Sequence, residues 1–96
     1  MGIDELLGAN RQAFLEIAKR HGAQNVRIFG STARGEATPA SDLDVLVTME
    51  KGRSLLDLCA LGNDLEDLLQ RKVDVVTEPA ISPHLRERIL REAIPL

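Results

Sequence analysis

The sequence has few of the residues that several kinds of protein depend on. Trp and Tyr are absent and Phe occurs only twice, which removes the base-stacking surfaces of single-strand nucleic-acid binders. The single cysteine, Cys59, excludes an internal disulfide and a cysteine-rich zinc site, and it fits a reducing compartment. No apolar run approaches the roughly 18 residues of a membrane span, and the early acids of the N-terminus do not fit a signal peptide. We therefore expect a cytoplasmic protein without a membrane segment.

Length and charge favour one small domain without an affinity for nucleic acid. The chain has 96 residues and a formal net charge of −3, and it carries no basic tail. We treat residues 1–96 as a single domain with a small core of Leu, Ile, Val and Ala. Without clustered Lys and Arg, direct nucleic-acid binding is not expected. A core this small also favours a site in a cleft on one face over a deep enclosed pocket.

Hydrophobic periodicity predicts alternating helices and short strands. In chain order we expect a helix at 3–20, strands at 25–30 and 42–48, a helix at 54–70, a strand at 72–77 and a helix at 82–93. This order predicts an α+β fold, in which helices cover a small mixed sheet in layers. In the last helix Leu85, Ile89 and Ala93 are expected to face inward. Cys59, in a leucine-rich helix, is expected to be a buried, inert thiol.

The stretch Gly30–Gly35, with the sequence GSTARG, follows the first expected strand. Gly30 allows the backbone to turn and a ligand to come close. Ser31 is a suitable N-cap for a short helical turn, and Gly35 is a suitable end for it. The start of such a turn offers free N–H groups and partial positive charge to a phosphate, and Arg34 can add a charged contact. A plain strand-to-turn junction is the alternative interpretation.

Three aspartates form the second group of candidate residues. Asp42 and Asp44 are two positions apart in an expected strand, so their carboxylates project from the same face. Two adjacent carboxylates repel each other unless a cation lies between them, and Mg²⁺ prefers such ligands. Asp74 can join them if its strand lies beside theirs. The alternatives are a pair of solvated acids at a strand end and an edge-strand acid that points to water.

These residues resemble a known motif. Gly30 and Ser31, ten intervening residues, and then Asp42 and Asp44 match the signature of the DNA polymerase β-like nucleotidyltransferase superfamily. Asp74 falls where that superfamily carries its third carboxylate. The short chain is similar to the minimal nucleotidyltransferases, which are often paired with a small helical partner of the HEPN class as toxin–antitoxin modules. The resemblance implies a nucleotidyltransferase-like fold over nearly the whole chain.

The resemblance also implies roles for the phosphate-facing residues. Gly30 and Ser31 would hold the phosphates of a nucleoside triphosphate. Many relatives carry a basic residue where this chain has Thr32, and Arg34 would supply the positive charge instead. The nucleotide implied for a minimal antitoxin of this type is ATP.

The three aspartates receive the metal and catalytic roles. The resemblance implies that Asp42 and Asp44 bind two Mg²⁺ ions, and that Asp74 completes this metal site and helps to activate the acceptor hydroxyl. The implied reaction is attack on the α-phosphate of ATP with release of pyrophosphate. The implied acceptor is a tyrosine hydroxyl on a HEPN-type toxin, which makes the protein an adenylyltransferase and an antitoxin.

Two other functions stay open at the level of sequence. A non-catalytic antitoxin would neutralise its partner by forming a complex, with the nucleotidyltransferase site idle. Transfer to a small molecule such as an aminoglycoside ranks lower, because the chain offers no second domain to form that pocket.

Overall fold

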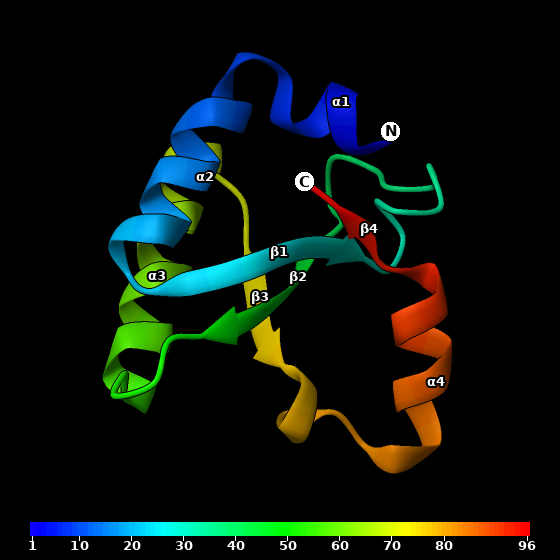
Figure 1. Ribbon diagram of the computed structural model, residues 1–96. Helices are drawn as coiled ribbons and strands as arrows, with labels where there is room; N and C mark the ends of the chain where they lie inside the picture. The colour runs from blue at the N-terminus through cyan, green and yellow to red at the C-terminus, as the bar shows by residue number, and fades with distance from the viewer.

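The computed structural model describes all residues 1–96 and contains one four-stranded sheet, four α-helices and two short 3₁₀ helices. Figure 1 shows α2 and α3 on one side of the sheet and α4 on the other. In chain order the elements are α1 (Ile3–Leu7), η1 (Gly8–Asn10), α2 (Arg11–Arg20), β1 (Ala23–Phe29), β2 (Leu43–Met49), α3 (Leu55–Leu69), β3 (Val73–Thr77), η2 (Glu78–Ala80), α4 (Pro83–Glu92) and β4 (Ile94–Pro95).

The sheet is mixed and has the strand order β3-β2-β1-β4. Strand β1 pairs antiparallel with β2 and with β4, whereas β2 and β3 are parallel. The long helix α3 makes the crossover between the two parallel strands, as such a connection requires. The predicted α+β fold with a small mixed sheet is therefore confirmed. None of the helices could span a membrane.

The core lies between one face of the sheet and helices α2 and α3. The β2 residues Leu43, Val45 and Val47 alternate along the strand and are almost completely buried. Leu61 and Leu65 of α3 pack into the same cluster. Helix α3 begins where predicted, because the Ser54 side chain accepts a hydrogen bond from an amide of the first turn and Asp57 completes a capping box. The apolar alternation of β2 thus fixes which face its other side chains occupy.

The expected single helix at 3–20 is wrong. The chain forms α1, one 3₁₀ turn and α2 instead, and the break lies at Gly8. Gly8 has a φ of 50°, a conformation that ends a right-handed helix. The hydrophobic spacing identified the residues that face the core, but it did not show that the backbone changes direction within them.

Helix α4 is also less buried than predicted. Leu85 is 48% exposed and no residue of α4 is buried, so the expected inward face at Leu85 is wrong. The helix stands apart from the α2–α3 layer in Figure 1 and is followed by the unpredicted strand β4. Cys59 is exposed, which corrects the expected buried thiol, because its position on α3 falls outside the stripe that contains Leu61 and Leu65.

Two leucines of α3 provide a test of where the core lies. We expect Leu61→Ala to lower the free energy of unfolding by about 3 kcal/mol, because it leaves a cavity in a fully buried site. Leu56→Ala, at a position that is 80% exposed, should change it by less than about 0.5 kcal/mol. Urea unfolding followed by circular dichroism measures both. Equal effects of the two substitutions would contradict this placement of the core.

Candidate active site

The Gly30–Gly35 turn is present as a hydrogen-bonded turn that directly follows β1. The Arg34 amide donates to the Gly30 carbonyl at 3.2 Å, and the Glu36 amide donates to the Ser31 carbonyl at 2.8 Å. The turn closes at Gly35, whose φ is 76°. The turn and its end at Gly35 are as predicted, but residues 30–35 form a hydrogen-bonded turn and not a helix.

Gly30 lies against the carboxylate of Asp44. Its φ is 75°, and a Cβ at this position would lie 2.2 Å from Asp44 Oδ2. Gly30 pairs with no residue of β2 directly, but the preceding residue, Phe29, is opposite Asp44 in the antiparallel register. Glycine is therefore required twice here, for its backbone angle and for the space that the carboxylate occupies.

The parallel pairing of β2 with β3 places Asp44 directly beside Asp74. Asp44 is partly buried. Burial raises the pKa of its carboxyl group, and the nearby charges of Asp74 and Asp42 raise that pKa further. Asp42 precedes β2, is exposed, and lies 4.0 Å from the Lys72 ammonium. The strand pairing therefore brings Asp44 and Asp74 together, while Asp42 stands at the rim.

The chemistry of these side chains fits a divalent cation. Carboxylates on neighbouring strands repel each other, and the raised pKa of Asp44 reflects burial first and this repulsion second. A bound cation would remove this cost, and oxygen ligands of this kind suit Mg²⁺. In the arrangement described here, no group of three His, Cys, Asp or Glu side chains is close enough to hold a metal ion. The aspartates thus fit a metal in chemical type, and their metal-binding role stays a prediction.

Glu92, at the end of α4, also belongs to this region, although no sequence motif predicted it. Its carboxylate accepts a hydrogen bond from the Gly30 amide at 3.1 Å and another from Arg34 Nη1. Burial alone would raise the pKa of Glu92, but the bonds from Arg34 and Gly30 outweigh it and the pKa lies below its usual range. Arg34 also donates from Nε to Glu36 at 2.7 Å. An acid in the last turn of a helix opposes the helix dipole, and this is the signal that could have singled it out.

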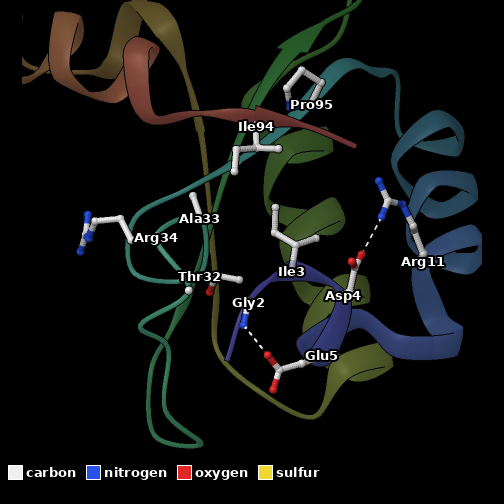
Figure 2. A pocket seen from close by; sticks show the side chains of 11 residues that line it. Gly2, Ile3, Asp4, Glu5, Arg11, Thr32, Ala33, Arg34, Ile94 and Pro95 are labelled. Atoms are coloured by element: carbon white, nitrogen blue, oxygen red, sulfur yellow. Dashed lines mark hydrogen bonds and ion pairs between the residues drawn. The ribbon is translucent and has the colours of Figure 1, made fainter.

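The largest cavity adjoins the same turn from another side. It has a volume of about 530 Å³ and is bounded by α1, the turn and β4. Figure 2 shows Thr32 and Ala33 of the turn facing Ile3 and Ile94 across it. None of the three aspartates lines this cavity; Asp74 instead borders a second one of about 330 Å³ between α3 and β3. The turn therefore separates the aspartates from the larger hollow.

Comparison with known proteins identifies the family. Residues 11–96 match the nucleotidyltransferase domain family. The chain belongs to this family. "Putative protein adenylyltransferase MJ0435" of Methanocaldococcus jannaschii is 43% identical over 94 residues, which cover 98% of this chain and 97% of that protein. "Protein adenylyltransferase MntA" of Thermococcus cleftensis is 36% identical over 92 residues, which cover 96% of this chain and 90% of the relative.

Solved structures agree with this nucleotidyltransferase assignment. A structure described as a "putative minimal nucleotidyltransferase" is 55% identical and has a TM-score of 0.87, with all of this chain and 97% of that chain covered. A chain from a toxin–antitoxin structure with AMP-PNP shares the fold, with a TM-score of 0.76 at 20% identity over 90% of this chain and 71% of that chain. The predicted minimal nucleotidyltransferase and its fold are thereby confirmed.

Two glycines of the turn test the contact between Gly30 and Asp44. Both have positive φ, but a Cβ at Gly35 would meet nothing within 4 Å. We expect Gly35→Ala to cost only the backbone strain, and Gly30→Ala to cost about 1 kcal/mol more, because the Asp44 carboxylate must move. In an Asp44→Ala background the two substitutions should cost the same. A double-mutant cycle by urea unfolding measures this, and an excess cost that survives Asp44→Ala would rule the contact out as its cause.

The raised pKa of Asp44 gives a pH dependence of stability. A folded-state pKa above the ordinary value of 3.8 means that the folded protein keeps a proton which the unfolded chain has released. The Asp44 contribution to stability therefore falls as the pH rises above about 3.8. In EDTA, Asp44→Asn should thus be more stable than wild type at pH 7, with a smaller advantage at pH 4. Thermal unfolding at both pH values measures it; the exposed Asp67→Asn is the control and should show no such gain.

Proposed function

We propose that this nucleotidyltransferase moves AMP from ATP to a hydroxyl group of a partner protein, with Mg²⁺ bound by the aspartates. The observation that carries the proposal is the contact of Asp44 with Gly30. It joins a carboxylate pair to a turn whose amide groups suit phosphate. Two relatives with 43% and 36% identity, both named as protein adenylyltransferases, support transfer to protein.

Each residue of the site has a distinct task in this proposal. Gly30, Ser31 and Arg34 hold the triphosphate, since they lie on one turn with amide and guanidinium donors. Asp42, Asp44 and Asp74 would hold Mg²⁺, which would neutralise the charge that develops on the phosphates. Asp74 is more exposed than Asp44, with which it is paired. This exposure supports its proposed role as the group that accepts the proton of the acceptor hydroxyl.

The reaction is an in-line displacement at the α-phosphorus. The acceptor oxygen forms a bond to that phosphorus, and the bond from phosphorus to the bridging oxygen of pyrophosphate breaks. The hydroxyl proton passes to a carboxylate, and pyrophosphate leaves with the electron pair of the broken bond. One AMP is added to the acceptor for each ATP used.

The acceptor is proposed to be a tyrosine of a small helical HEPN-type toxin, which would make the protein an antitoxin. Because this chain contains no tyrosine, a tyrosine acceptor belongs to a second molecule. Leu55 and Leu56, at the start of α3, are 73% and 80% exposed and give an apolar surface for such a molecule. The fold shared with a chain of a toxin–antitoxin complex solved with AMP-PNP suits this setting.

Binding without transfer is the second candidate function, and the same exposed leucines favour it. A partner could be neutralised by docking on Leu55 and Leu56 even if the site did not turn over. The two candidates differ in whether the aspartates are needed.

Substitution of two aspartates separates these candidates. The protein is mixed with the product of its neighbouring gene, ATP and Mg²⁺, and the neighbour is weighed by mass spectrometry. We expect wild type to add the mass of AMP, and Asp42→Asn with Asp44→Asn to lower the rate by at least about 100-fold, as loss of catalytic metal ligands does. Asp67→Asn, with an exposed acid on α3, is the matched control and should retain the rate.

Protection of cells from the partner is the second readout of the same variants. Under adenylyl transfer, the double variant should no longer protect, although it stays folded. Protection by the double variant at the wild-type level would favour neutralisation by binding. An unmodified neighbour, with both proteins folded and ATP and Mg²⁺ present, would count against the proposed transfer.

A further inference from the structure

Glu92 occupies the donors that a nucleotide phosphate would use. One carboxylate oxygen accepts the Gly30 amide hydrogen at 3.1 Å, and the other accepts from Arg34 Nη1. The side chain is only 16% exposed. A phosphate oxygen and a carboxylate oxygen make the same kind of charge-assisted hydrogen bond to an amide and a guanidinium. The Gly30 amide has one hydrogen, so a phosphate oxygen and Glu92 compete for it, and they also compete for the Nη1 hydrogen of Arg34 that points to Glu92.

The rest of Arg34 stays oriented if Glu92 leaves. Its Nε donates to the side chain of Glu36 at 2.7 Å, and Glu36 directly follows the turn and does not depend on α4. One of the two Nη1 hydrogens is bonded to Glu92. Departure of Glu92 would therefore free one guanidinium donor and one backbone donor side by side, without loss of the turn that carries them.

The end of α4 can give up this contact at little cost to the core. No residue of α4 is buried, and α4 supplies no member of the core cluster. Strand β4 keeps the helix attached through its pairing with Arg27 and Ile28 of β1. Figure 1 shows the end of α4 next to β4 and to the chain that leaves β1. The Glu92 side chain is thus held mainly by Gly30 and Arg34.

We propose that Glu92 is a placeholder for the nucleotide phosphate, which occupies the Gly30 amide and Arg34 in the empty enzyme and is displaced when a nucleoside triphosphate binds. This inference rests on the proposed function, because it assumes that the turn binds triphosphate. In this scheme the nucleotide phosphate competes with the Glu92 carboxylate. The carboxylate keeps the turn in shape when no nucleotide is bound, and it lowers the apparent affinity for the nucleotide. Displacement also moves a negative charge away from Asp44, on which Glu92 acts electrostatically.

Glu92→Gln tests the competition through binding rather than activity. The ligand is the Mg²⁺ complex of α,β-methylene-ATP. A CH₂ group replaces the oxygen between its α- and β-phosphorus atoms, so AMP cannot be transferred. Affinity is measured by calorimetry. We expect Glu92→Gln to bind about tenfold more tightly than wild type, because a neutral amide replaces one charge-assisted acceptor on these donors. Glu87→Gln makes the same charge change on an exposed part of α4 and should bind like wild type.

Thermal unfolding of the same proteins gives an independent readout. Without nucleotide, Glu92→Gln should melt below wild type, because the tie between α4 and the turn is weakened. At saturating nucleotide the difference in melting temperature should vanish, since the side chain at position 92 is displaced from the turn in both proteins. If Glu92→Gln does not fold, Glu92→Asp, which is too short to reach both donors, should show the same tighter binding.

The possible results lead to different conclusions. Equal or weaker binding by the Glu92 variants, with wild type and Glu87→Gln binding normally, would overturn the placeholder and show that Glu92 supports the bound nucleotide. A melting difference that persists at saturation would overturn it as well. If neither wild type nor Glu87→Gln binds the nucleotide, the proposed function itself fails.

Discussion

The contact between the Asp44 carboxylate and Gly30 is the constraint on which the arrangement of the site depends. Asp44 is fixed by strand pairing on both sides, opposite Phe29 of β1 and beside Asp74 of β3. The carboxylate fills the space where any larger residue at position 30 would place its Cβ. The turn must therefore leave β1 at a glycine, and its first amide lies next to the acids. The carboxylates and the amide groups of the turn are adjacent because Asp44 and Gly30 are in contact.

The acids are held at this place against their own repulsion. Burial and the neighbouring aspartates raise the pKa of Asp44, which means that the ionised form is disfavoured by the folded state. The opposite face of β2 offsets this electrostatic cost, because Leu43, Val45 and Val47 are almost completely buried in the core beneath the helices. The same alternation that buries these side chains thus places Asp44 on the opposite face of β2, next to Asp74 of β3. Stability of the strand and strain at the site come from one sequence pattern.

Local patterns in the sequence predicted the features that local physics determines. The alternation of Leu43, Val45 and Val47, the capping box at Ser54 and the end of the turn at Gly35 each depend on a few neighbouring residues, and they were found correctly. The expected pairing of Asp42 with Asp44 on one strand face was not found, because β2 begins at Leu43 and leaves Asp42 outside the strand. Non-local features were not accessible in this way. The pairing of β4 with β1 involves only two residues of β4, too few to give a periodic signal, and the exposure of α4 depends on which elements happen to pack against it.

Glu92 shows why part of the candidate site could not be read from the sequence alone. It is 62 residues away from Gly30 in the chain, so no motif joins the two. Its own position was nevertheless informative: a carboxylate at the C-terminal end of a helix is disfavoured by roughly 0.3–1 kcal/mol. The bonds from Gly30 and Arg34 offset that cost and keep the pKa of Glu92 low. An acid that violates a local rule needs a compensating partner elsewhere, and here that partner is the turn that also suits phosphate.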